Sequence, residues 1–352
     1  MQVSSWTPIH KGRFSGIRAY CHHFSAFSAH CIVTVTRAIA LKPVEGSLQL
    51  EIVEKAWLKF QWFFTSYDSR LAAFYLMCTI VMVFAIWLFR GRPSGFVKFL
   101  LPREVYFHRS NLIDIQVFLI NLFLGALGIF SATLFTPVIA NFVLHQLVWY
   151  QGTAFQPLDI TWGRSALATL IVVLTLDFCK YWAHFIHHEN RLLWPFHALH
   201  HSAEVMTPLT ANRNHPVFLL IRNLIYSFVL GAVQALVLYL LIGKIDLLTI
   251  GGANAGYFVF NLLGANLRHS HVWLSYGPVL EHIFISPAQH QIHHSRAKKH
   301  FNKNYGEVFA IWDWMFGTLY VPNGYEELEF GLADANGNPI EQPHRNLKEA
   351  LI

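Results

Sequence analysis

Histidine stands out in this sequence by its number and by its spacing. The chain of 352 residues carries 21 histidines, and 14 of them lie between residues 184 and 300. His184 and His188 are four residues apart, which places both on one face of a helix. Two later clusters share the spacing i, i+3, i+4, namely His197, His200 and His201, and His290, His293 and His294. Imidazoles gathered on helix faces in this way indicate a metal site.

The number of imidazoles bears on which metal they hold. Eight or nine exceed what one ion takes, because zinc prefers four ligands in all. Two six-coordinate irons, each keeping a position for oxygen or water, fit nine histidines better. The alternatives are a histidine cluster without metal, a zinc-dependent integral membrane hydrolase or isomerase that uses part of the set, and a metal transporter. HExxH is absent, since Leu192 stands four residues after His188, and only Asp114 and Asp177 lie near apolar runs,.

The composition is that of an integral membrane protein. Hydrophobic residues make up 54% of the chain and charged residues 13%, against about 25% charged residues in soluble domains. The net charge of +6 resides largely in loops and in the N-terminal region, as expected near anionic headgroups. We expect no nucleic-acid partner, because no basic groove with interleaved aromatic residues is visible. The four cysteines form no CxxC pair, which disfavours a disulfide framework or a zinc knuckle.

Five apolar runs are candidates for membrane spans, namely 71–89, 112–135, 165–182, 224–243 and 247–267. Pro137 divides the apolar stretch 112–149 and leaves a shorter second segment. The runs 224–243 and 247–267 form a hairpin that returns His269 and the last cluster to the membrane face of the first cluster. The loop 90–110 contains five Lys or Arg residues, which places it in the cytoplasm. We therefore expect an all-α bundle of about 4–6 transmembrane helices with a cytoplasmic histidine-rich helical cap.

Three regions are expected along the chain. Residues 1–65 form a basic N-terminal region, and its first 44 residues contain no Asp or Glu, as in a transit peptide or a disordered arm. Residues 66–322 form the transmembrane domain with the histidine clusters. Residues 323–352 are polar and form a soluble C-terminal tail.

Four motifs together resemble the fatty acid hydroxylase/sterol desaturase superfamily, over about residues 110–322. They are DxxxYWxHxxxH (Asp177, Tyr181, Trp182, His184, His188), HxxHHSxE (His197, His200, His201, Ser202, Glu204), PxxHxxHHS (Pro287, His290, His293, His294, Ser295) and NYG…WDxxFGT (Asn304, Tyr305, Gly306, Trp312, Asp313, Phe316, Gly317, Thr318). The chain departs from the family pattern at two places. Phe185 stands where Arg is often found, and His271 stands where Asn is often found.

The resemblance implies a non-haem di-iron centre, molecular oxygen as co-substrate and a membrane lipid as substrate, which is hydroxylated or desaturated. Carried over by position, the iron ligands are His184, His188, His197, His200, His201, His290, His293 and His294, with His269 as a further ligand. Because the chain has no dinucleotide fingerprint, electrons come from an external NAD(P)H-linked donor. A ferredoxin or a b-type cytochrome with its reductase is implied, docked on the basic cytoplasmic loops.

Several further residues are expected to support the ligands. A ligating imidazole usually donates its second N–H to a carboxylate or a carbonyl. The candidate acceptors are Asp177, Glu204 and Asp313. Arg213 or His215 could pair with Glu204, or His215 could complete the ligand shell. His271 is either an extra ligand or a spectator, and we expect the spectator. We expect His187 to lie off the ligand face, either behind a ligand or in solvent.

Overall fold

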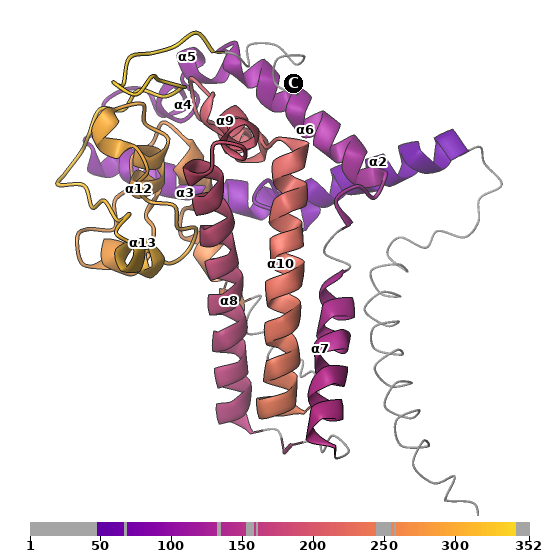
Figure 1. Cartoon of the computed structure of the whole chain (residues 1–352). Coiled ribbons are helices and arrows are strands. Elements are labelled where there is room, and N and C mark those ends of the chain that lie inside the picture. Colours follow the sequence, from indigo (N-terminus) through magenta and orange to yellow (C-terminus); the bar gives the residue numbers. More distant parts are fainter. Residues whose placement is uncertain are drawn as a thin grey trace, which may run out of the picture.

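Three helices run side by side in the lower part of the molecule (Figure 1). They are α7 (Phe135–Gln151), α8 (Trp162–Glu189) and α10 (Pro216–Val237), and α10 continues as the π-helical turn η3 (Leu238–Ile242). The computed structural model describes residues 48–66, 69–131, 135–152, 158–159, 161–243, 255–256 and 258–342. Within these ranges the regular structure is helical, as expected, and β structure is limited to three isolated bridges.

Local sequence determines where the two longest helices begin. The side-chain oxygen of Thr161 accepts a hydrogen bond from the backbone N–H of Arg164 at 3.3 Å and so caps α8,. At α10, Nδ1 of His215 accepts from the N–H of Val217 at 3.1 Å. Pro216 then occupies the first turn, where its missing N–H has no helical partner to lose,.

α8 and α10 with η3 are the two described helices that are long and apolar enough to cross a membrane. They correspond to the expected spans 165–182 and 224–243. In the most apolar 18-residue segments of these two helices, only 28% and 33% of the residues are buried. Apolar side chains such as Leu170, Phe228 and Leu240 face outward. An exposed apolar surface of this kind suits lipid better than water.

The other three expected spans correspond to helices that are shorter or only partly described. The stretch 112–149 is divided, but not at Pro137. α6 (Ser110–Ala126) ends before the expected end at 135, and α7 begins at Phe135 with Pro137 in its first turn, so both helices have 17 residues. α6 and α3 (Ala73–Phe89) are shorter apolar helices. In the return segment, 244–254 and residue 257 lie outside the described residues, 258–262 is helical, and η4 (Ala265–His269) follows.

The other helices gather at one end of the bundle and form a head (Figure 1). Besides α3, α6 and η4, they are α2 (Leu48–Thr65), α4 (Phe96–Leu100), α5 (Arg103–Tyr106), α9 (Trp194–His201), η2 (Pro208–Asn212), η5 (Leu280–His282), α12 (Pro287–His293), η6 (Lys298–His300) and α13 (Ile311–Phe316). α2 packs against α6, and α3 packs against α4 and η4. Val83, Leu267 and Val272 form one of the small buried cores that join these elements.

The ends of the chain are only partly described. Residues 1–47, most of the expected basic N-terminal region, lie outside the described residues. Part of the expected C-terminal tail lies against the segment that follows α12. Ser295 forms a β-bridge with Phe330, and Arg296 pairs with Glu329 at 2.6 Å. The tail therefore contacts the part of the head that carries the last histidine cluster.

Candidate metal centre

The last two turns of α8 supply the first histidines. His184 and His188 are one helical turn apart, and their ring centroids are separated by 5.0 Å. α8 extends the expected apolar run 165–182 as one continuous helix to Glu189. This continuation carries both imidazoles beyond the apolar part of α8 into the head.

α9 divides its three histidines between two sides. His197 and His201, four residues apart, lie with the histidines of α8, with ring centroids 4.8 and 4.7 Å from His188. His200 is rotated by about 100° from its neighbour on the helix and approaches His269 instead, with 5.1 Å between centroids.

α12 divides its cluster in the opposite sense. A capping box fixes its start, since Ser286 and Gln289 exchange side-chain to backbone hydrogen bonds at 3.0 and 3.1 Å,. The outer pair, His290 and His294, lies near His269, with centroids 4.6 and 5.0 Å away. The middle histidine of the cluster, His293, lies instead near the histidines of α8, 4.5 Å from His184 and 4.8 Å from His188 between centroids.

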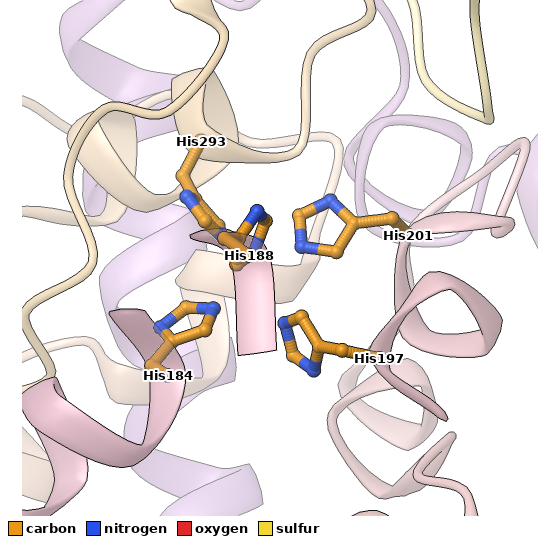
Figure 2. Close-up of side chains that lie close together, drawn as sticks. All are labelled: His184, His188, His197, His201 and His293. Atoms are coloured by element: carbon orange, nitrogen blue, oxygen red, sulfur yellow. The ribbon is translucent and has the colours of Figure 1, made fainter. Parts of the chain in front are cut away.

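The nine histidines expected as ligands thus form two groups. In each group one ring nitrogen per residue lies within 4.8 Å of all the others. The first histidine group is His184, His188, His197, His201 and His293, whose rings converge in Figure 2. The second histidine group is His200, His269, His290 and His294. No carboxylate or thiolate of the described residues belongs to either group.

The second histidine group has spacings that suit a metal ion. The Nε2 atom of His269 lies 3.3 Å from Nε2 of His200 and 3.2 Å from Nε2 of His290, and Nε2 of His294 lies 3.2 Å from Nε2 of His290. Nitrogens bound at about 2.1 Å to one ion, at angles between octahedral and tetrahedral values, are about 3.0–3.4 Å apart. The three distances fall in this range.

The first histidine group fits a metal on a different observation. Each of its five side chains has a buried Nε2 atom with no hydrogen-bond partner among the described residues. Buried polar atoms are almost always satisfied, and an unsatisfied one calls for an explanation. A shared metal ion would satisfy all five nitrogens.

Burial keeps these imidazoles neutral. It lowers the pKa of His200 to about 3. It also places the pKa values of the other ligand candidates outside α8 well below the usual range, and their neighbouring imidazoles lower them further. A histidine binds metal in its neutral form, so the head holds these side chains ready to bind metal at neutral pH.

Comparison with known proteins agrees with this arrangement. The sequence model of the family described as "Fatty acid hydroxylase" matches residues 169–318, which include all nine histidines. Ornithine lipid hydroxylase of Rhizobium tropici is 32% identical over 168 residues, 47% of this chain and 46% of that protein. Human alkylglycerol monooxygenase is 26% identical over 266 residues, 76% of this chain and 50% of that protein.

A Delta(7)-sterol 5(6)-desaturase of Gibberella zeae is 32% identical over 154 residues, 43% of this chain and 37% of that protein. These matches confirm the resemblance to the fatty acid hydroxylase/sterol desaturase superfamily that the sequence motifs indicate. It spans about half, or less, of the length of these three relatives. No solved structure matches it significantly.

Backbone carbonyls orient two of the imidazoles. Nδ1–H of His184 donates to the carbonyl of Tyr305 at 2.8 Å, and Nδ1–H of His293 donates to the carbonyl of Lys303 at 2.7 Å. A donor role for Nδ1 leaves the lone pair on Nε2, the atom that faces the group. No signal in the sequence marks these acceptors, because any residue supplies a carbonyl.

Asp313 supports this segment without touching a histidine. Its carboxylate accepts hydrogen bonds from the N–H groups of Tyr305 and Gly306, each at 2.8 Å, and from the hydroxyl of Thr318 at 2.6 Å. An added Cβ on Gly306 would lie 2.8 Å from this carboxylate, so the turn closes tightly on it. Asp313 thus fixes the turn whose carbonyl accepts the hydrogen bond of His184.

Asp177, which we expected to accept a hydrogen bond from an imidazole, is placed differently. It accepts the N–H groups of Val308 and Phe309 at 3.1 and 3.0 Å, and the indole N–H of Trp312 at 3.0 Å. Lys180, three residues further along α8, forms an ion pair with Glu307 at 3.4 Å. Asp177 therefore ties α8 to the segment that precedes α13.

Arg213 holds α9 in place and pairs with Asp114 at 3.2 Å rather than with Glu204. It also donates to the carbonyl of Leu199 at 2.9 Å and to the hydroxyl of Ser202 at 2.7 Å. The backbone N–H of Glu204 donates to Ser110 at 3.3 Å. The sequence marked Asp114 only as an acid within an apolar run. Its ion pair with the buried Arg213 explains why a carboxylate is tolerated there,.

The remaining histidines named from the sequence lie outside both groups. His215 caps α10, as described above. Nε2–H of His271 donates to the carbonyl of Phe99 at 2.7 Å, and His271 belongs to neither group. His187 is buried, hydrogen-bonds the carbonyl of Ala183 on its own helix at 2.6 Å, and packs against Phe218.

A cavity of about 500 Å³ adjoins both histidine groups. Five candidate ligands contribute to its wall, namely His184, His197, His200, His269 and His290. Apolar side chains from α2, α8 and α10, including Phe63, Leu176 and Phe218, line other parts of it. A ligand in this cavity would lie beside both metal positions and against apolar surface.

Proposed function

We propose that the chain is a di-iron, oxygen-dependent oxidoreductase that hydroxylates or desaturates an unactivated C–H position of a membrane lipid. One observation carries the proposal: two adjoining groups of neutral imidazoles, five and four in number, border the same partly apolar cavity. A zinc site would need about four ligands. Nine imidazoles in two groups favour two ions with higher coordination numbers and open positions, as iron has in oxygenases.

The chain's own residues have three tasks in this reaction. The nine imidazoles would hold the two irons, and the carbonyls of Lys303 and Tyr305 keep two of these imidazoles in the binding tautomer. The walls of the cavity would place the substrate beside the irons and exclude water from them. With iron bound at both groups, the centre would supply the oxidation of a C–H bond by molecular oxygen.

The names of the relatives support a lipid as the substrate. They are an ornithine lipid hydroxylase, an alkylglycerol monooxygenase and a sterol desaturase. These names have in common the oxidation of a lipid, and they differ in the kind of lipid and in the product. The apolar part of the cavity wall suits a hydrocarbon chain or ring of any of these lipids.

For the membrane we propose four crossings, formed by α7, α8, α10 and the return span expected from the sequence at 247–267. α7 and α8 both pack along α10, and apolar side chains of all three helices face outward. The histidine-rich head would then lie on one side of the membrane. The cations of the loop 90–110 belong to this head and are exposed, so the positive-inside rule favours the cytoplasm for it.

The same exposed cations would receive the electron donor. They are Arg90, Arg92, Lys98, Arg103 and Arg109. A positive surface steers an acidic partner such as a ferredoxin or a b-type cytochrome. We propose that such a donor, reduced by an NAD(P)H-linked reductase, binds here.

Metal analysis of the purified chain tests the proposal directly. We expect about two irons per chain and oxygen consumption that depends on added lipid and reductant. One zinc and no iron per chain would contradict the proposal. The lipid consumed is identified by comparing lipid extracts of cells with and without the gene.

A histidine variant tests whether the centre carries the activity. His200→Ala should abolish the oxygen-dependent product, because it removes a buried ligand of the second histidine group. His282→Ala is the matched control, since His282 is exposed and belongs to neither group. Full turnover in His200→Ala would refute the ligand assignment.

A further inference from the structure

The cavity beside the histidine groups carries an excess of positive charge. Four cations line it, Arg70, Lys180, Arg222 and Arg268, together with the carboxylate of Glu307. Four positive charges and one negative charge leave a formal excess of three. The histidines of the wall do not compensate this excess, because they are neutral.

Glu307 compensates only part of this charge. It forms ion pairs with Arg70 and, at 3.4 Å, with Lys180. Burial raises the pKa of Glu307, but Lys180, Arg70, Arg268 and Arg222 lower it more, so its pKa lies well below the usual value. Glu307 is therefore an ionised carboxylate whose Oε1 atom is already paired with Arg70 and Lys180.

Arg268 is buried, and no carboxylate of the described residues forms an ion pair with it. The residue is 1% exposed, and its Nε and Nη1 atoms have no hydrogen-bond partner in the described part of the chain. Its Nη2 donates a long hydrogen bond of 3.4 Å to the carbonyl of Ile285, and the guanidinium lies over the ring of Phe260, 4.6 Å from its centroid. These contacts supply only part of what a buried guanidinium loses in hydration.

Arg222 lies on α10, near the histidines of the first group. It is one turn beyond Phe218, whose ring is 4.8 Å from that of His197, and one turn before Tyr226. Its guanidinium is 5.7 Å from the centroids of both Phe218 and Tyr226. Its Nε is buried and has no partner among the described residues.

Both arginines therefore lie close to the proposed irons. Arg268 directly precedes His269 in the chain, and Arg222 is one helical turn, about 5 Å, from a residue that contacts His197. Neither arginine is within ion-pair distance of a carboxylate of the described residues. Buried cations are stable when an anion accompanies them, and a guanidinium matches the oxygens of a phosphate or carboxylate in a bidentate manner.

We propose that the cavity binds the anionic headgroup of a lipid, a phosphate or a carboxylate, between Arg222 and Arg268. This rests on the proposed function, because it specifies the substrate of the same site. The hydrocarbon part of the lipid lies against the aromatic and aliphatic wall. A free anion would use the arginines but not this apolar wall, so the geometry favours an anionic amphiphile.

Matched probes test the proposal on the full chain, prepared with added iron, in a non-ionic detergent. The probes are a lysophosphatidate, a free fatty acid and a monoacylglycerol that carry the same hydrocarbon chain, together with inorganic phosphate alone. We expect the two anionic lipids to bind about tenfold or more tightly than the monoacylglycerol. Inorganic phosphate should bind far more weakly than lysophosphatidate. Equal binding of the neutral and anionic lipids would overturn the proposal.

Two variants assign the preference to the arginines. Arg222→Gln and Arg268→Gln should each bring the binding of the anionic lipids closer to that of the monoacylglycerol. If Arg268→Gln fails to fold, the proposal is still tested by Arg222→Gln alone. Arg164→Gln is the control, because Arg164 lies in the first turn of α8, at the opposite end from the histidines. An unchanged preference in Arg222→Gln would refute the assignment.

The readouts separate this proposal from the proposed function. Binding is measured without turnover, and iron content is measured on every variant. Two irons and lipid oxidation without an anionic preference would refute only the headgroup site. An anionic preference that depends on Arg222, in a chain that binds no iron, would refute only the di-iron function.

Discussion

The rings of His201 and His294 stack on each other, with centroids 4.4 Å apart and planes inclined by 23°. They belong to different histidine groups and come from different helices, since His201 ends α9 and His294 caps α12. The stack therefore joins the two proposed metal positions directly. A displacement of one ring changes the packing of the other.

The adjacent residues His293 and His294 should have different effects on metal binding. His293→Ala removes a nitrogen from the first histidine group, whereas His294→Ala removes one from the second. We expect each variant to lose mainly one iron, and a different one. Mössbauer spectra of iron-loaded protein would distinguish the two remaining sites. Identical spectra for the two variants would contradict the division into groups.

Asp313 should make stability depend on pH in a defined direction. Burial raises its pKa to about 6 from the ordinary value of 3.8. The folded chain therefore holds this proton more tightly than the unfolded chain. The resulting contribution to stability is fully present below about pH 3.8 and is lost as the pH rises through about 6.

The variant Asp313→Asn tests this sign, because an amide does not titrate. Thermal midpoints of the two proteins are compared from pH 7 down to pH 5. We expect the stability of the wild-type chain to increase relative to the variant as the pH falls, by a total of about 1–2 kcal/mol. A difference that stays constant over this range would refute the raised pKa.

The sequence was sufficient to predict which histidines meet, but not how they are divided. The i, i+3, i+4 spacing places imidazoles on helix faces, and the expected nine are the nine that gather. Whether His293 joins the histidines of α8 or those of η4 depends on how α12 is rotated, which tertiary packing sets. The carbonyls of Lys303 and Tyr305 could not be predicted, because a backbone acceptor leaves no trace in residue type.

The sequence was less informative about carboxylates and spans. Asp177 matched the expected pattern of a residue that supports a ligand, yet its oxygens accept N–H groups of the segment before α13. An acid on a helix can meet any nearby donor, and the turn that supplies these donors is far away in sequence. Apolar runs predicted α8 and α10, but the runs 71–89 and 112–135 correspond to helices of only 17 residues, because hydropathy alone does not set where a helix ends.

Gly231 should be essential for the contact between α10 and α7. A Cβ at this position would lie 2.7 Å from the carbonyl oxygen of Thr136 and 2.9 Å from Cβ of Ile139. Gly231→Ala must therefore separate the helices, and we expect it to cost about 1–3 kcal/mol of stability. The control is Gly163→Ala in the first turn of α8, where an added Cβ meets no atom within 4 Å. A thermal midpoint as high in Gly231→Ala as in the control would contradict this packing.

The basic loop should affect electron delivery and leave the metal centre unchanged. Arg92 and Arg103 are exposed, and replacing both with Glu reverses two charges on the proposed docking surface. We expect the KM for a reduced ferredoxin or b-type cytochrome to rise about tenfold, with the effect diminishing at high salt because mobile ions screen such contacts.

Turnover driven by a small chemical reductant distinguishes docking from damage to the site. It should be the same in the wild-type chain and in the double variant, and both should bind the same amount of iron. Arg164→Glu reverses a charge at the far end of α8 and serves as the matched control. If the double variant retains the wild-type KM for each donor protein, the donor binds elsewhere on the head.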